Sequence, residues 1–181
     1  MEYPNSYVAT GICHGPRDGE VVTVRPARTE DIPALTAYVT AMSPEERRLR
    51  YMSTMTAAAR IKEFSYVYGE ALDYDTHMVF LVENAALEIV GVVHACGPCT
   101  HESGFYEVSY SRDLRYRGAG VGTLLMQTVI AWGKDRGLRG FYADTLRENT
   151  RMQDLFKKFA FGRVAVHPDG DFSCFRYRLP F

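Results

Sequence analysis

Apolar residues in the first part of the chain change from the alternation of a strand to the spacing of helices. The stretch VVTVRPA, which begins at Val21, is rich in β-branched residues and predicts the first strand. A helical stripe of apolar residues follows, and Thr29 stands where it could cap that helix. Ser43, Pro44 and Glu46 then have the pattern of a capping box, which predicts the start of a second helix.

Strands dominate the middle of the chain, and helical spacing returns toward its end. Alternating β-branched and aromatic residues predict strands at 77–83, 87–96, 104–113 and 140–146. Apolar stripes predict helices at 56–67, 120–136 and 148–160. Gly137 should end the long helix, and residues 162–179 predict a hairpin around a Pro-Asp-Gly turn.

Composition limits the chain to a single folded unit. With 181 residues, of which 46% are hydrophobic, it can bury one sizeable core. Residues 1–20 are rich in glycine, proline and polar residues and predict a flexible N-terminal arm. The folded domain is therefore expected at 21–181.

Charge and hydropathy argue against several classes of partner. The 21 basic and 22 acidic residues nearly cancel, so we expect no binding to nucleic acid or to an anionic membrane. There is no signal-peptide pattern and no apolar run near the ~18 residues that a spanning helix needs. We expect a cytoplasmic protein whose four cysteines are free thiols.

Two cysteines in the stretch HACGPCTH raise the question of thiol or metal chemistry. Cys96 and Cys99 lie between His94 and His101. A redox pair needs a helix start to lower the thiol pKa, whereas the residues that follow Cys99 are typical of a strand. We favour a Gly-Pro turn with incidental thiols, and leave zinc binding and redox sensing as alternatives.

The stretch RYRGAGVGTLL, at 115–125, carries the clearest chemical signal. Glycines at 118, 120 and 122 let the backbone approach a ligand closely, and the amides of the helix that follows would point at an anion. Arg115 and Arg117 add positive charge, so a phosphate group is the expected ligand. The spacing fits neither the dinucleotide fingerprint nor the P-loop.

Arg117, Gly120 and Gly122 match the signature Q/R-x-x-G-x-G/A of the GCN5-related N-acetyltransferases (GNATs), which the chain resembles over residues 21–180. Residues 43–54 and 73–83 are similar to the bacterial protein-lysine (Pat-like) subgroup. The resemblance implies an α/β (α+β) fold in one GNAT domain. Its mixed, mostly antiparallel sheet should have about six to seven strands with a V-shaped splay, flanked by helices.

The resemblance also implies acetyl-CoA as cosubstrate, with no metal. The strand before the glycine loop should pair with the pantetheine arm, the loop should hold the diphosphate, and an asparagine should contact the arm near the sulfur. By similarity these residues are Tyr110, Ser111, Arg112, Arg117, Gly118, Ala119, Gly120, Val121, Gly122, Thr123 and Asn149.

Two carboxylates are candidates for the base that deprotonates an amine. Glu107 matches the glutamate of Pat-like enzymes, and Asp144 is the fallback. The tyrosine that commonly reprotonates the thiolate is replaced here by Phe156. Either water or another tyrosine, such as Tyr106, Tyr110 or Tyr142, donates that proton, or the acid is unnecessary.

These features predict an N-acetyltransferase that acts on a primary amine, either a protein lysine or a small molecule. A non-catalytic acyl-CoA-binding regulatory module is the alternative, because the usual tyrosine is missing. Aromatic and acidic residues that could line an amine pocket are Tyr51, Tyr66, Asp73, Tyr68, Tyr74 and Asp75. The oligomeric state is left open, with a homodimer among the options.

Overall fold

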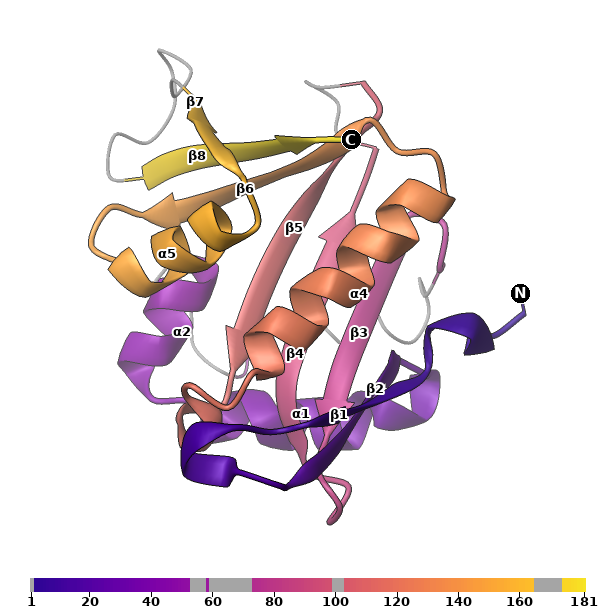
Figure 1. The fold of residues 1–181 in the computed structure, drawn as a ribbon, viewed down its shortest axis with the longest axis vertical. Coiled ribbons are helices and arrows are strands. Elements are labelled where there is room, and N and C mark those ends of the chain that lie inside the picture. The colour runs from indigo at the N-terminus through magenta and orange to yellow at the C-terminus, as the bar shows by residue number, and fades with distance from the viewer. Residues whose placement is uncertain (1, 53–57, 59–72, 99–102, 165–173) are drawn as a thin grey trace.

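A computed structural model describes residues 2–52, 58, 73–98, 103–164 and 174–181 (Figure 1). Several sequence predictions fall outside these residues. They are most of the helix at 56–67, Tyr66, Tyr68, Cys99, His101 and the Pro-Asp-Gly turn. Among the described residues, no helix combines the length and apolar character that crossing a membrane requires.

The strands form one eight-stranded sheet in the order β1-β2-β3-β4-β5-β6-β8-β7. Their bounds are β1 (Ala9–Ile12), β2 (Val21–Pro26), β3 (His77–Glu83), β4 (Ile89–Cys96), β5 (Phe105–Arg112), β6 (Gly140–Leu146), β7 (Gly162–Val164) and β8 (Cys174–Pro180). Neighbours are antiparallel except β5 and β6, which are parallel. The predicted mixed α/β sheet is confirmed, with more strands than the expected six to seven.

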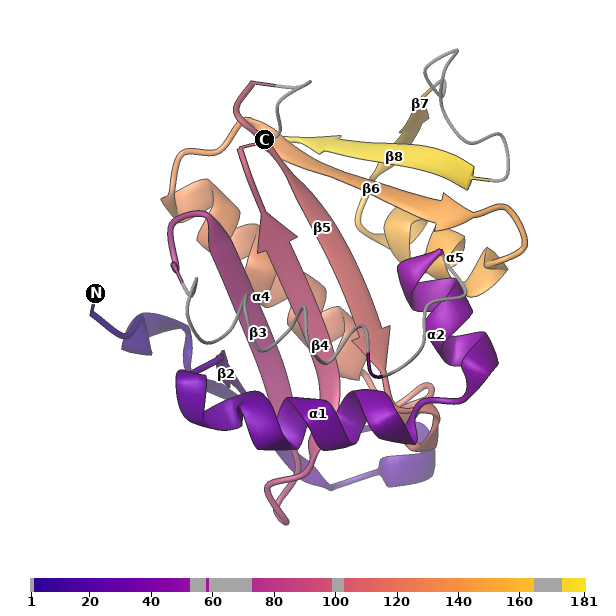
Figure 2. The ribbon, with the colours of Figure 1, turned by 180° about the vertical axis from the view of Figure 1, so that it is seen from behind.

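Helices cover both faces of this sheet (Figures 1 and 2). The α-helices are α1 (Ile32–Ala41), α2 (Pro44–Tyr51), α4 (Val121–Asp135) and α5 (Thr150–Lys158), and short 3-10 helices are η1 (Asn5–Tyr7), η2 (Gly15–Arg17), η3 (Thr29–Asp31) and η5 (Leu114–Tyr116). α4 and α5 lie on one face, and α1 and α2 lie on the other. A core around Trp132 packs under α4, and a second core around Leu35 packs under α1.

The sheet splits between its two parallel strands. β5 pairs with β6 only from Phe105 to Glu107, whose partners are Gly140 and Tyr142. Beyond Glu107 the two strands diverge, while β6 stays paired with β8 along its whole length (Figure 1). This is the predicted V-shaped splay, and Glu107 lies at its apex. α2 contacts both β5 and β6.

Local sequence signals set the start of α2 and the end of α4. The capping box at Ser43 is confirmed, because Glu46 N donates to Ser43 Oγ at 3.1 Å and Ser43 N donates to Glu46 Oε2 at 2.8 Å. Gly137 follows α4 with a φ of 68°, as predicted. The expected cap at Thr29 is wrong, since Thr29 begins η3 and the Asp31 carboxylate instead accepts from the Arg28 amide at 2.7 Å.

The residues before Val21 add structure that the sequence pattern does not predict. β1 pairs with β2 in an antiparallel register from Ala9 opposite Val24 to Ile12 opposite Val21. Cys13 follows it and is buried in the core under α4. The sheet edge is therefore formed by a segment that composition alone marks as an arm.

Candidate functional site

A loop rich in glycine connects η5 to the first turn of α4. Gly118 and Gly120 adopt φ values of 77° and 91°, in the left-handed region that favours glycine. Gly120 is the N-cap residue and makes no side-chain cap hydrogen bond. The N–H groups of the first turn of α4 have no carbonyl acceptor within the helix. They therefore point into the space that precedes α4.

Tyr110 of β5 explains why the loop needs its third glycine. A Cβ added at Gly122 would lie 2.6 Å from Tyr110 Oη, so any other residue there would require the Tyr110 ring to shift. Burial raises the pKa of Tyr110 to about 12, so its hydroxyl keeps its proton at neutral pH. The strand and the helix start are thus packed directly against each other.

A cavity of about 820 Å³ opens beside this loop. It is bounded by β5, the loop, the first turn of α4, helices α2 and α5, and the segment around β1. It brings together the predicted cofactor residues Tyr110, Ser111, Arg112, Gly118, Ala119, Gly120, Val121, Gly122, Thr123 and Asn149. Arg117 is not among the lining residues, and its side chain is exposed.

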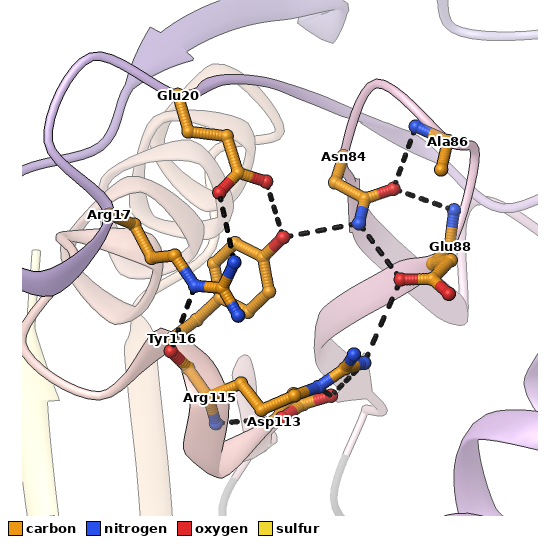
Figure 3. Close-up of polar contacts among 8 residues, drawn as sticks. All are labelled: Arg17, Glu20, Asn84, Ala86, Glu88, Asp113, Arg115 and Tyr116. Atoms are coloured by element: carbon orange, nitrogen blue, oxygen red, sulfur yellow. Dashed lines mark hydrogen bonds and ion pairs between the residues drawn. The ribbon is translucent and has the colours of Figure 1, made fainter.

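The side chain of Arg115 faces the carboxylates of Asp113 and Glu88 (Figure 3). Its guanidinium donates to Asp113 Oδ2 at 2.9 and 2.7 Å, and lies 3.7 Å from Glu88. The prediction that Arg115 supplies charge beside a phosphate is therefore not supported. The sequence alone could not predict this, because the ion-pair partner of Arg115 is determined by the fold and not by the neighbouring glycines.

A polar network holds the start of the loop in place (Figure 3). Tyr116 donates a hydrogen bond to Glu20 and accepts one from Asn84 Nδ2 at 3.1 Å. Arg17 donates to the Arg115 carbonyl at 3.3 Å, and its guanidinium lies 4.7 Å from the centre of the Tyr116 ring. The loop is thereby anchored to the β1–β2 turn and to the β3–β4 turn.

Several lining residues were missed from the sequence. They are Gly11, Ile12 and His14 near β1, Glu46, Leu49 and Arg50 on α2, and Arg151, Asp154 and Lys158 on α5. Periodicity identifies the polar ones only as the exposed faces of helices. Lys158 Nζ crosses to the first turn of α4 and donates to Thr123 Oγ1 at 2.8 Å.

Asn149 has a structural role as well as a place in the cavity. It is the N-cap residue of α5, and its Oδ1 accepts from the Met152 amide at 3.3 Å. This fixes the side chain at the cavity wall. Across the cavity, Ser111 Oγ accepts a hydrogen bond from Tyr38 Oη of α1 at 3.2 Å.

Glu107 lies at the apex of the splay and is not among the residues that line the cavity. It faces Cys96 on β4 and Tyr142 on β6. Tyr142 Oη donates to Glu107 Oε2 at 3.2 Å. The carboxylate is half-buried on the sheet face that carries α1. Tyr110 lies an odd number of residues further along β5, so its side chain points to the opposite face.

Asp144 is placed differently from Glu107. Both of its oxygens are bound by Arg176 of the neighbouring strand, with distances of 2.8 and 2.7 Å to Nε and Nη2. It also lies outside the cavity lining. The bidentate pair with Arg176 therefore directs the Asp144 carboxylate toward β8.

Phe156 is fully buried in an aromatic cluster and does not line the cavity. Its ring centre lies 5.1 Å from those of both Phe161 and Tyr177. Of the three tyrosines considered as proton donors, Tyr106 donates to the Asp75 carbonyl, Tyr142 donates to Glu107, and Tyr110 lines the cavity.

The CxxC stretch is only partly described. Cys96 is the last residue of β4, and no group of three metal-binding side chains occurs in the described part of the chain. Nearby, His77 Nδ1 lies 3.3 Å from His94 Nε2. Cys99 and His101 lie outside the described residues, so the zinc and redox alternatives stay untested.

Comparison with known proteins places this site in context. The sequence model of the acetyltransferase (GNAT) family matches residues 43–161. The GNAT domain of S. lividans PAT has 21% identity and a TM-score of 0.82, over 99% of this chain and 100% of that one. Mycobacterium smegmatis RimJ in complex with CoA-disulfide has 17% identity and a TM-score of 0.69, and the match covers 99% of this chain and 90% of that one. The ribosomal-protein-S5-alanine acetyltransferase of Vibrio fischeri has 16% identity and a TM-score of 0.62, and the match covers 88% of this chain and 92% of that one. At these identities the structural likeness is one of fold.

Proposed function

The chain belongs to the acetyltransferase (GNAT) family, and from this premise we propose that it is an acetyl-CoA-dependent N-acetyltransferase acting on a primary amine. One observation carries the proposal. The amide-rich start of α4 opens into a cavity that continues along β5, where β5 leaves β6. The loop end of the cavity provides backbone N–H groups that can donate hydrogen bonds to a phosphate. The rest of the cavity provides the backbone amides of strand β5.

The residues present fit an acyl-CoA. The first-turn amides of α4, together with Gly118 to Thr123, would hold the diphosphate by charge-assisted hydrogen bonds. Tyr110, Ser111 and Arg112 lie beyond the last β5–β6 pair, so backbone groups on that edge would pair with the pantetheine arm. Asn149 would contact the arm on the side of α5, and Arg117 remains a predicted contact at the loop. When bound, the thioester supplies the activated acetyl group.

The acceptor amine must lose a proton before it can attack. A lysine-like amine has a pKa of about 10.4, so presenting it neutral at pH 7 costs about 4.6 kcal/mol. Glu107 would accept this proton at the apex of the splay, where Tyr142 orients its carboxylate. The amine nitrogen would then bond to the acetyl carbon, the carbon–sulfur bond would break, and the departing thiolate would take up the second proton that the nitrogen loses as the amide forms.

The acceptor is proposed only as a class. Similar folds include the GNAT domain of PAT and a ribosomal-protein-alanine acetyltransferase, which makes a protein amine a reasonable acceptor alongside a small molecule. We further propose a cytoplasmic protein whose transferase domain comprises the expected residues 21–181 together with the β1 segment, which pairs with β2. Neither nucleic acid nor membrane is an expected partner.

A second candidate is a non-catalytic acyl-CoA-binding module. The observation that favours it is Phe156, whose ring is enclosed by Phe161 and Tyr177 and brings no hydroxyl to the cavity. This candidate predicts binding of CoA without acetyl transfer to any amine.

The test combines calorimetry with a thiol assay. Acetyl-CoA mixed with the pure protein and a set of lysine peptides and small amines should release free CoA only when an acceptor is present. Binding of CoA without release in any mixture would favour the regulatory module. Absence of heat when CoA is titrated into the protein would overturn both proposals.

A further inference from the structure

Two side chains other than the expected arginines can donate hydrogen bonds to a phosphate at the loop end of the cavity. Arg115 is bound to Asp113 and lies near Glu88, and Arg117 does not line the cavity. At the same end of the cavity, Lys158 and His14 do line it. They come from opposite ends of the sequence and meet at the glycine loop.

Lys158 is placed where a cation needs an anionic partner. Its ammonium donates to Thr123 Oγ1 at 2.8 Å, in the first turn of α4. The last turn of α5 favours the ammonium of Lys158, whereas the start of α4 carries partial positive charge that repels it unless an anion lies between them. A phosphate at the α4 amides would be within the reach of Lys158 and would remove this conflict.

His14 is held at the other side of the loop by backbone contacts. Its amide donates to the Ala119 carbonyl at 3.2 Å, and its Cδ2 lies 3.7 Å from the position of a Cβ added at Gly120. The segment cannot move away easily, because Cys13 is 1% exposed in the core and its amide donates to the Glu20 carbonyl. The imidazole is therefore presented to the cavity by a fixed backbone.

The other charged residues of the cavity lie along its walls on β5, α2 and α5. Arg112, Arg50 and Arg151 are cationic, and Glu46 and Asp154 are anionic. The Glu46 carboxylate already accepts the Ser43 amide, and Asp154 lies 3.4 Å from Lys157. The balance around the loop thus favours an anion.

We propose that His14 and Lys158 bind the diphosphate of CoA together with the loop amides, which makes the segment before Val21 a part of the cofactor site. The inference rests on the proposed function, because it concerns the same cavity. It adds two side chains to the loop residues that the resemblance predicts as diphosphate contacts.

Isothermal calorimetry with CoA and with 3′-dephospho-CoA tests the assignment. His14→Ala and Lys158→Ala should each weaken CoA binding by about three- to tenfold, and the double variant should weaken it more than either single variant. The loss should be the same with 3′-dephospho-CoA, since the diphosphate is common to both ligands. Lys157→Ala and Asp18→Ala are matched controls, as both are exposed neighbours that do not line the cavity.

The outcomes separate the two proposals. If the unsubstituted protein binds CoA and both variants bind it equally well, the inference fails while the proposed function stands. A loss that disappears with 3′-dephospho-CoA would overturn the assignment to the diphosphate. Thermal unfolding without ligand checks each variant, and calorimetry is run below the lowest unfolding temperature.

Discussion

Tyr142 Oη donates a hydrogen bond of 3.2 Å to Oε2 of Glu107 across the last paired position of β5 and β6. The guanidinium of Arg176 lies 5.0 Å from the centre of the Tyr142 ring and supports the ring from the adjacent strand. The carboxylate is thus oriented where the sheet begins to open. Orientation of a base by a second side chain is a common feature of acid–base catalysis.

Replacement of Glu107 by glutamine should lower kcat by about 10²- to 10⁴-fold, because the amide cannot accept the proton of the acceptor amine. The Kd for CoA should not change, since Glu107 does not line the cavity. Steady-state release of CoA and calorimetry measure the two effects. Full activity in this variant would remove Glu107 as the base.

Tyr142→Phe should have a smaller effect than Glu107→Gln. The ring and its contact with Arg176 remain, while the hydrogen bond from Tyr142 Oη to the carboxylate is lost. We expect kcat to fall by about tenfold, as for loss of a single positioning hydrogen bond, with KM for acetyl-CoA unchanged. A rise in KM without a change in kcat would instead place Tyr142 in binding.

Asp144→Asn separates the fallback base from the leading one. Both oxygens of Asp144 are occupied by Arg176, so the variant should keep its rate of acetyl transfer. Because the pair is partly exposed, the free energy of unfolding should fall by only about 1 kcal/mol. Urea unfolding and the CoA-release assay check this. A loss of activity as large as that of Glu107→Gln, with stability intact, would identify Asp144 as the base.

Phe156→Tyr tests whether the missing hydroxyl matters. Phe156 is 1% exposed between Phe161 and Tyr177, and a phenol there would bury a polar group. We expect no gain in kcat and a loss of about 1–3 kcal/mol in the free energy of unfolding. A faster enzyme would show that the hydroxyl reaches the departing sulfur and that the natural residue limits the rate.

Features fixed by local chemistry could be predicted from the sequence. The capping box at Ser43 and the glycine loop at Gly118 to Gly122 depend on a few adjacent residues, and both are found in the structure. The strands at 77–83 and 140–146 were predicted with their observed ends, since β-branched and aromatic alternation is strong there.

Features that depend on distant partners could not be predicted. β1 exists because Ala9 to Ile12 pair with β2, and nothing in their own sequence marks them as a strand. His14 and Lys158 reach the glycine loop only through tertiary packing. The phenylalanine at 156 is visible in the sequence, but its burial between two other rings is not.

Arg25 should be essential for stability. It donates to both oxygens of Asp31 at 2.7 and 2.6 Å, and also binds Glu83, and the three side chains are only 11–13% exposed. Arg25→Met would leave the carboxylates of Asp31 and Glu83 without the arginine and poorly solvated. The free energy of unfolding, measured with urea, should therefore fall by about 3–5 kcal/mol. Arg48→Met is the control, because Arg48 pairs with the exposed Glu148 and should lose under about 1 kcal/mol. Equal losses in the two variants would contradict this assignment.

His94 should make the protein sensitive to acid. Burial lowers the pKa of His94 from 6.5 to about 3, and the positive charges of Arg50 and His77 act in the same direction. In the unfolded chain the His94 imidazole therefore takes up a proton below about pH 6.5. In the folded chain it takes up this proton only near pH 3. The stabilising contribution of neutral His94 is complete above pH 6.5 and is lost as pH falls toward 3.

The free energy of unfolding should consequently decrease by up to about 1.4 kcal/mol per pH unit through this group. His94→Gln keeps a polar side chain but cannot take up the proton, so its unfolding free energy should fall less steeply between pH 6.5 and pH 4. Urea titrations at half-unit steps of pH give the two slopes. His14→Gln provides the control, because His14 is exposed and its removal should leave the steep dependence in place. If His94→Gln retained the slope of the unsubstituted protein, the acid sensitivity would have to arise from other groups, and the neutral state of His94 in the folded protein would be refuted.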